Sequence, residues 1–323
     1  MQVSKIARAS KPTLGDRFSR TMRSYWRYRY LMLLLIPSIV VLLIFKYEPM
    51  YGVIIAFKNF KIKLGITGSP WYDPFWGVFA KAFGKPAFWQ AFQNTVILGI
   101  MNFVIGFPMP IILALLLNEL RNERYKKVVQ TFSYLPHFIS WVTLSGLFIQ
   151  LLSPSTGPLA ALARACGLTP YYFMGEVSTF RWVLVVTNIW KSVGWGSIIY
   201  LAALSAVDQE MYEAALIDGA SRFQRVWYIT LPSILPTVTV MLILRSGSIL
   251  SDNFDQVYNM MNSAVYRVSN VLGVYTYDLG LKNMTNSSLA EATAVGLFRN
   301  VISLALVLIT NGISKKISDN GIW

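Results

Sequence analysis

The residues with the most specific spacing in this chain lie in a polar stretch, EAALIDGASRFQRVWYITLP, at residues 213–232. The stretch belongs to a segment of about 28 residues, 204–231, that separates two apolar runs. The helices of a multi-span membrane protein are usually joined by short turns, whereas this segment carries charges of both signs and the signals for two short helices. These residue types suit pairing with a second protein, so we interpret the segment as a docking element.

Capping residues predict where the two short helices begin and end. Asp208 can accept free backbone N–H groups at the start of the first helix. Gly219 stands where that helix should stop, at a position that favours left-handed backbone geometry. Ser221 and Gln224 form an S-x-x-Q capping box for the second helix. Pro232 suits the first turn of the next spanning helix, where its missing N–H costs nothing.

The fixed residues of this segment have the spacing of a known motif. They follow the pattern E-A-A-x3-G-x9-I-x-L-P, and the positions are Glu213-Ala214-Ala215, Gly219, Ile229 and Leu231-Pro232. The segment therefore resembles the EAA loop of permease subunits from binding-protein-dependent ABC importers. The resemblance implies a coupling helix that sits in a groove of a cytoplasmic ATPase. The alternative is an amphipathic hairpin at the membrane interface with no partner.

The resemblance implies a role for each coupling residue. Seven residues are expected to take part: Glu213, Ala214, Ala215, Asp218, Gly219, Arg222 and Arg225. The two acids would complement a basic rim of the ATPase, and the two alanines would let the helix sink into the groove. The glycine would hold the bend between the short helices, and the two arginines would bind acidic residues of the ATPase.

Composition places the rest of the chain in a membrane. Hydrophobic residues make up 54% of it and the mean hydropathy is +0.48, too apolar for an ordinary soluble domain. Six candidate spans lie at about 30–46, 94–117, 130–152, 180–203, 232–250 and 290–313. Each is near the ~20 residues that cross a ~30 Å hydrocarbon core, and lipid forces all of them to be helical. We therefore expect an all-α polytopic protein with six transmembrane helices, the first interrupted at Pro37. The resemblance implies the type I ABC importer permease fold with its MetI-like core.

The distribution of positive charge predicts the orientation in the membrane. The net charge is +14, and sixteen Lys and Arg residues fall in segments that lie on one side of the six spans. The opposite loops hold nine such residues, spread over many more positions. The positive-inside rule therefore places both termini and the EAA loop in the cytoplasm. That is where a docking surface for an ATPase must be, and the membrane is expected to be the bacterial cytoplasmic (inner) membrane.

Four parts of the chain are expected. Residues 1–29 form a basic cytoplasmic tail, and 30–92 form the first transmembrane helix and an aromatic outer loop. Residues 93–314 form the core ABC permease domain with the EAA loop at 204–231, and 315–323 form a second cytoplasmic tail. The basic tail has no signal-peptide character and is expected to lie along the anionic inner leaflet. Aromatic residues of the outer loop suit the membrane interface better than stacking on sugars.

The sequence offers no catalytic centre of a familiar kind. No G-x-x-x-x-G-K-[ST] loop occurs, so the chain does not itself bind ATP by that route. There is one histidine, His137, and one cysteine, Cys166, which excludes a His-rich metal site, a Cys/His nucleophile and an internal disulfide. We expect a subunit that is not an enzyme and holds no cofactor. The resemblance implies that ATP and Mg are bound by partner subunits.

Polar residues inside the apolar spans are the candidates for a substrate pathway, because charges there are costly and usually face the bundle interior. The candidates are Asn188, Trp190, Lys191 and Trp195. Amide and ammonium donors would meet sugar hydroxyls or uronate carboxylates. The alternative is that Lys191 and Arg245 satisfy carbonyls and carboxylates between helices. Glu291 and Arg299 are expected to pair helices.

Further stretches resemble one branch of the family, the larger permeases of complex-carbohydrate importers. They are FKYEPMYGVIIAFKNF (45–60), YLPHFISWV (134–142), IWKSVGWGSIIYLAALS (189–205) and ATAVGLF (292–298). The resemblance implies a second, different permease, two ATPase subunits and an extracytoplasmic binding protein. A cationic pathway would suit an acidic polysaccharide such as alginate, but Lys191 lies in a stretch shared by the whole branch and does not identify alginate.

Two other functions are consistent with a polytopic protein. An ion-coupled secondary carrier needs carboxylates near the middle of the membrane, and only Glu291 is a candidate, near the end of a span. A membrane enzyme of polysaccharide or lipid synthesis needs clustered acids at the interface. Asp252 and Asp255 come nearest to such a cluster, and they are expected on the outer side, where no nucleotide sugar is present.

Overall fold

The computed structural model describes residues 27–318, which form helices and no β-strand. The all-α class is thereby confirmed for this part of the chain. The described residues fall into two units, one ending at Ile54 and the other beginning at Ile55. The basic tail expected at 1–29 lies almost entirely outside the described residues, and so do the last five residues, 319–323.

The first unit is an apolar helix that contains a π-helical turn. α2 (Arg29–Leu42) passes into η1 (Leu43–Tyr47), α3 (Glu48–Met50) and the 3₁₀ segment η2 (Tyr51–Phe57), within which the first unit ends. The expected interruption at Pro37 is wrong, because α2 continues through this residue. A proline removes one backbone hydrogen bond, and the remaining turns of an apolar helix keep theirs because lipid offers no substitute.

The second unit is built from long helices joined by short ones. The long helices and the segments that continue them are α6 (Pro86–Met101), η4 (Asn102–Gly106), α7 (Pro108–Asn118), α8 (Glu123–Tyr134), η5 (Leu135–Phe138), α9 (Trp141–Leu151), α11 (Val177–Ser205), α14 (Leu231–Ser246) and α18 (Asn286–Ser318). The short elements are η3 (Ile62–Leu64), α4 (Gly65–Gly68), α5 (Gly77–Phe83), α10 (Pro158–Ala165), α12 (Gln209–Ile217), α13 (Arg222–Arg225), η6 (Val226–Thr230), α15 (Phe254–Met260), η7 (Ser263–Val265), α16 (Tyr266–Ser269), α17 (Leu272–Tyr277) and η8 (Asp278–Lys282).

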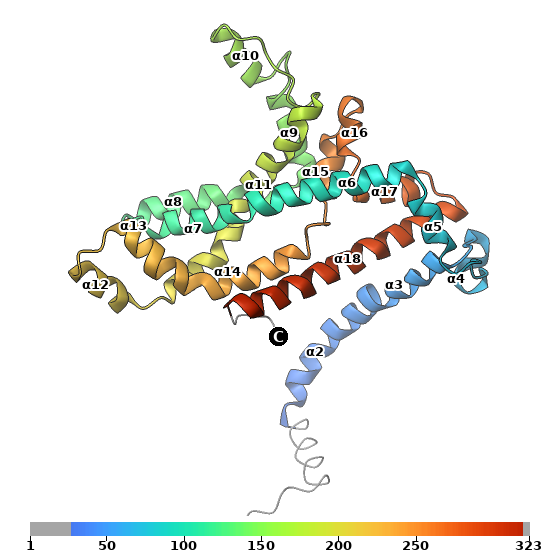
Figure 1. Ribbon diagram of the computed structural model, residues 1–323, viewed down its shortest axis with the longest axis horizontal. Helices are drawn as coiled ribbons and strands as arrows, with labels where there is room; N and C mark the ends of the chain where they lie inside the picture. The colour runs from blue at the N-terminus through green and yellow to red at the C-terminus, as the bar shows by residue number, and fades with distance from the viewer. Residues whose placement is uncertain (1–26, 319–323) are drawn as a thin grey trace, which may run out of the picture. The chain divides into compact units, whose positions relative to one another are not determined.

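The helix α11 is the centre of the second unit. It contacts α6, α7, α8, α14 and α16 along its length (Figure 1). Its second half buries Tyr200 against Ile111 of α7 and Ile234 of α14. The contact with α8 depends on Gly194, because a Cβ at this position would lie 2.1 Å from the Ser133 carbonyl oxygen. Only a glycine lets the two backbones approach this closely.

Fewer helices qualify as membrane spans than the six expected from the sequence. By length and apolar composition, four helices of the described chain qualify: Arg29–Phe57, Pro86–Asn118, Arg222–Ser246 and Asn286–Lys316. A bent pair, Glu123–Phe138 with Trp141–Leu151, raises the number to five. The remaining expected span, 180–203, lies within α11, whose 29 residues reach about 44 Å at ~1.5 Å per residue. The number six stays a prediction.

The expected span at 130–152 is two helices and not one. α8 ends in the 3₁₀ segment η5, and α9 starts in a direction that differs by 104°. Ile139 between them is extended, and Ser140 caps the new helix by accepting a hydrogen bond from the Thr143 N–H at 3.3 Å. Pro136 lies in the first turn of η5. Because a proline has no N–H to donate to a carbonyl of the preceding turn, the α-helix ends here.

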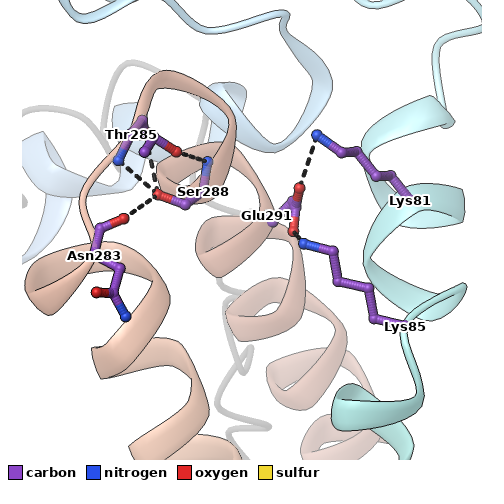
Figure 2. Close-up of polar contacts among 6 residues, drawn as sticks. All are labelled: Lys81, Lys85, Asn283, Thr285, Ser288 and Glu291. Carbon is purple, nitrogen blue, oxygen red and sulfur yellow. Dashed lines mark hydrogen bonds and ion pairs between the residues drawn. The ribbon is translucent and has the colours of Figure 1, made fainter.

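Two buried carboxylates fasten the last helix to the rest of the unit. Glu291 of α18 is 2% exposed and forms ion pairs with Lys81, at 3.0 Å, and with Lys85 (Figure 2). Further along α18, Arg299 pairs with Asp252 at 3.0 Å, and the Asp252 carboxylate also accepts the Gly273 N–H. The prediction that Glu291 and Arg299 pair helices is confirmed.

The start of α18, next to Glu291, is closed by a reciprocal cap. The Thr285 N–H donates to Ser288 Oγ at 2.8 Å, and the Ser288 N–H donates to Thr285 Oγ1 at 3.2 Å. Ser288 Oγ in turn donates to the Asn283 carbonyl at 3.1 Å (Figure 2). Because these bonds use the backbone donors that a helix start leaves free, the first turn of α18 holds Glu291 in a fixed place.

Removing the charge of Glu291 should loosen the contact between α5 and α18. We expect Glu291→Gln to lower the free energy of unfolding by about 1–2 kcal/mol, since two charge-assisted bonds are lost while the two lysines remain partly solvated. The thermal midpoint of the purified protein measures this. Lys282→Gln, which removes an exposed pair with Asp278, is the control and should change it by less than about 0.5 kcal/mol. Equal midpoints for both variants would contradict the assignment.

Candidate functional site

The segment 204–231 folds as the capping residues predict. α12 begins after Asp208, whose carboxylate accepts the Glu210 N–H at 3.0 Å. It ends at Ile217, and Gly219 follows with φ +76°. The Ala220 N–H reaches back to the Ala215 carbonyl at 2.9 Å, and the Gly219 N–H to the Leu216 carbonyl at 3.1 Å. This is the Schellman arrangement that glycine favours.

The second helix of the segment is longer than expected. Its predicted capping box is present, with the Ser221 N–H donating to Gln224 Oε1 at 2.8 Å and the Gln224 N–H to Ser221 Oγ at 3.4 Å. The helix then runs on without a break, through the π-helical turn η6, into α14. Pro232, expected in the first turn of the spanning helix, instead lies within the continuous helix Arg222–Ser246, in the first turn of its α14 portion. The wider π turn before it accommodates the missing N–H, so the docking segment is continuous with a membrane span.

The tip of this loop presents both charged and apolar side chains. Five of the seven expected coupling residues are exposed, while Ala215 and Arg225 are half-buried. Sequence reasoning missed two exposed apolar residues at the end of α12, Ile217 at 87% and Leu216 at 61%. The signal that would have found them is their place in the last turn before Gly219, in a helix too short to bury them. Exposed apolar residues surrounded by charges mark a protein contact.

A second apolar surface continues along the same segment. Phe223 and Trp227 stack with ring centroids 6.3 Å apart, and Tyr228 is 74% exposed beside them. Inside the loop, the Tyr212 hydroxyl lies 3.0 Å from Thr230 Oγ1 and ties α12 to η6. The loop is therefore held to its own span while its tip stays free to contact another chain.

The structure separates the four residues expected along a substrate pathway. The Lys191 ammonium donates to the carbonyls of Pro136, His137 and Ile139 at 3.2, 2.8 and 2.6 Å. These carbonyls belong to the break between α8 and α9, so Lys191 has the role described by the alternative interpretation, satisfaction of carbonyls between helices. Trp195 stacks on the His137 ring at 4.6 Å.

Trp190 and Asn188 lie apart from that break. Trp190 packs edge-on against Phe148 at 5.6 Å. The Asn188 amide donates to Asn102 Oδ1 at 2.9 Å and accepts from Asn253 at 2.7 Å. Of the four expected pathway residues, Asn188 lines a polar cavity.

That cavity has a volume of about 140 Å³ and lies between α6, η4, α11 and the segment after α14. Asn102, Asn188 and Asn253 present amides to it, and Arg245 and Asp252 line it as well. Arg245 forms no ion pair with any residue of the 27–318 range. The cavity offers hydrogen bonds to a polar solute but is smaller than the ~300 Å³ of an ordinary ligand pocket.

None of these residues forms a metal centre. Across residues 27–318, no group of three or more His, Cys, Asp and Glu side chains is placed to hold a metal ion. Cys166 is exposed and unpaired.

Comparison with known proteins agrees with this geometry. Residues 106–319 match the family described as binding-protein-dependent transport system inner membrane component. The chain belongs to this family. It is thus a permease subunit of a binding-protein-dependent importer, and the resemblance drawn from residues 213–232 is confirmed.

Relatives cover nearly the whole permease. Protein LplB of Bacillus subtilis (strain 168) is 42% identical over 302 residues, which are 94% of this chain and 93% of LplB. The polygalacturonan/rhamnogalacturonan transport system permease protein YteP of the same organism is 38% identical over 99% of this chain and all of its own length. A crystal structure of a bacterial ABC transporter involved in the import of the acidic polysaccharide alginate matches with TM-score 0.83 and 38% identity. The match covers 93% of this chain and 99% of the permease chain in that crystal structure.

Gly219 provides a test of the bend between the two short helices. No atom lies within 4 Å of a Cβ built there, so a larger residue meets strain from its backbone angle and not from a clash. We expect Gly219→Val to lower the free energy of unfolding by about 1 kcal/mol or more. It should also uncouple transport, while the protein still inserts into the membrane. Gly219→Asn, which tolerates left-handed geometry, should retain most activity. Uptake assays in vesicles compare them, and wild-type uptake by the valine variant would refute the role of the bend.

Lys191 tests whether the broken span depends on one ammonium group. In Lys191→Met, three carbonyls lose a charged donor, so the free energy of unfolding should fall by about 2–3 kcal/mol. Lys127→Met on the exposed face of α8 is the matched control and should leave the thermal midpoint unchanged. A Lys191→Met protein with the wild-type midpoint but altered sugar selectivity would instead place Lys191 on the pathway.

Proposed function

We propose that this permease is one of two different membrane subunits of an ATP-driven importer that carries acidic oligo- or polysaccharide across the cytoplasmic membrane. Two separate ATPase subunits bind ATP and Mg, and an extracytoplasmic binding protein delivers the substrate. The permease catalyses no reaction of its own and binds no nucleic acid. The single observation that carries the proposal is the fully formed loop of α12 and α13, whose tip is exposed.

The loop has the properties of a part that receives force from a partner. Its tip is closed by a Schellman bend at Gly219 and a capping box at Ser221, so its shape is set before any partner binds. Ile217 and Leu216 are available to enter a groove, while Glu213, Asp218 and Arg222 surround them with charge. Because α13 continues into α14, movement of the loop moves a membrane span directly.

In the proposed cycle, closure of the two ATPase subunits moves this loop and the corresponding loop of the second permease. The two helical bundles then rock between inward-facing and outward-facing states. We place the loop and both termini in the cytoplasm, on the distribution of Lys and Arg. We assign the core to residues 93–314, which include the whole central helix α11.

The substrate class rests on the relatives. YteP is described as a polygalacturonan/rhamnogalacturonan transporter, and the structural neighbour as an importer of the acidic polysaccharide alginate. A second structure of the alginate transporter, in complex with a pentasaccharide-bound periplasmic protein, matches with TM-score 0.83 and 38% identity. These names favour a uronate-bearing polymer, alginate among the candidates, and a periplasmic or extracytoplasmic delivery protein.

The two buried carboxylates described above in the second unit are both paired with cations, which disfavours the ion-coupled alternative. Glu291 is paired with two lysines, and Asp252, just after α14, is paired with Arg299. A carboxylate held by permanent cations is a poor site for a transported H⁺ or Na⁺, because its charge is already balanced. ATP-driven transport therefore remains the better account.

The loop contact is tested in the assembled importer. Ile217→Asp places a charge at the tip that enters the groove, and we expect ATPase subunits to dissociate and uptake to fall at least about tenfold, since burying an isoleucine is worth about 2–3 kcal/mol. Leu168→Asp alters another exposed apolar residue, 65% exposed against 87% for Ile217, far along the chain and should leave both properties unchanged. Co-purification of the ATPase and uptake of a labelled oligouronate by proteoliposomes are the measurements. Uptake that collapses with an ionophore while ATP remains would overturn the proposal.

A further inference from the structure

A large cavity lies at the end of the bundle away from the coupling loop. It has a volume of about 940 Å³ and is lined from α6, α11 and α16 by side chains that include Trp89, Gln90, Gln93, Arg181 and Arg267. We call it the arginine cavity. Arg181 stands 24 positions before Ser205, the last residue of α11, which is about 36 Å along the helix at ~1.5 Å per residue. The cavity and the coupling loop thus occupy opposite ends of α11.

One asparagine fixes the two arginines relative to each other. The amide nitrogen of Asn94 donates to the carbonyls of Arg267 and Asn270 at 3.0 and 2.9 Å, and its oxygen accepts from Arg181 Nη2 at 2.8 Å. Gln90 also donates to the Arg267 carbonyl, at 3.1 Å. The scaffold uses the backbone of Arg267 and one N–H of Arg181. The other N–H groups of the Arg181 guanidinium stay available, and Arg181 Nε is buried without a partner among the described residues.

No carboxylate of the described residues neutralises the positive charge of the cavity. Neither Arg181 nor Arg267 takes part in an ion pair within residues 27–318, and the lining contains no Asp or Glu. The neighbouring cations behave differently, because Lys81 and Lys85 are both held by Glu291 (Figure 2). Two guanidinium groups without carboxylates in a concave wall favour an anion, and their planar fork matches a carboxylate.

The other lining groups suit a sugar. Trp89 is 48% exposed, and its indole N–H donates to the Phe83 carbonyl at 2.8 Å, which holds the ring in place. A fixed aromatic face beside the amides of Gln90 and Gln93 offers a stacking surface and hydrogen-bonding groups for hydroxyls. A volume of this size is in the range of ~300–1,000 Å³ that accommodates an organic ligand.

We propose that the arginine cavity binds a uronate unit of the polysaccharide as it enters the permease, with Arg181 and Arg267 holding the carboxylate and Trp89 facing the ring. This site assignment rests on the proposed function. It explains why an importer of acidic polymer keeps unpaired arginines at the end of the bundle that receives substrate.

The test uses the whole importer in proteoliposomes, with ATP inside and the binding protein loaded with trigalacturonate outside. Arg267→Gln is the main variant, because the scaffold bonds to the backbone of this residue and not to its side chain. We expect its uptake to fall about tenfold, as loss of one charge-assisted bond predicts. Arg267→Lys should recover part of the loss, and Lys63→Gln, an exposed cation outside the cavity, should have no effect. Docking of the binding protein, measured separately by interferometry, should be unchanged.

Three outcomes would count against this assignment, and they differ from one another. If the wild-type importer takes up no trigalacturonate, the proposed substrate class fails and the assignment with it. If the wild type transports and Arg267→Gln transports equally well, the assignment is overturned while the proposed function stands. If Arg267→Gln transports poorly because the binding protein docks less tightly, the arginines belong to a protein contact and not to a sugar site.

Discussion

The structure of the second unit depends on how the backbone carbonyl groups at the break between α8 and α9 find hydrogen-bond donors. A helix that turns by 104° inside an apolar bundle leaves carbonyls without their usual donors, and lipid supplies none. The Lys191 ammonium donates to three carbonyls at the break, of which, among the described residues, only that of Pro136 also accepts a backbone N–H, from Ile139 at 3.3 Å. The ammonium charge is balanced by these carbonyl dipoles and by the face of Trp141 at 5.6 Å. Without this donor the bend would expose unpaired polar groups. The bend and the position of α11 are therefore set by the same contact.

Because α11 is fixed at this point, it connects the separate polar sites of the permease. Arg181, Asn188 and Lys191 lie on one continuous helix of 29 residues whose last residue, Ser205, leads into the coupling loop. The loop then returns through α13 directly into α14, which packs against α11. Packed helices move as bodies and not as deformable rods. A displacement of the loop is thus expected at the Asn188 cavity and at the arginine cavity together.

The capping residues predicted the coupling loop well, because they act on nearby backbone groups. Contacts between residues distant in sequence could not be predicted from such local signals. Asp208, Gly219, Ser221 and Gln224 act on backbone groups within a few residues, so their spacing alone determines the caps. The partner of Lys191 lies 52–55 positions away, and no periodicity encodes that distance. The same holds for Asn94, whose amide joins three elements. Hydrophobicity located the apolar segments, but it did not indicate that one of them was bent.

Net charge was a poor guide to function. Whether each Lys or Arg has a carboxylate or carbonyl partner is a better one. The chain carries a charge of +14, which alone would suit many polyanions. Cations that fasten helices are all engaged: Lys85 by Glu291, Arg299 by Asp252 and Lys191 by carbonyls. Arg181, Arg245 and Arg267 have no carboxylate partner in the described chain, and each of them lines a cavity. Arg245 and Arg267 are exposed and Arg181 is half-buried, so a solute in either cavity can reach these cations. Cavities that keep such cations are therefore expected to gain their counter-charge from the solute that passes through them.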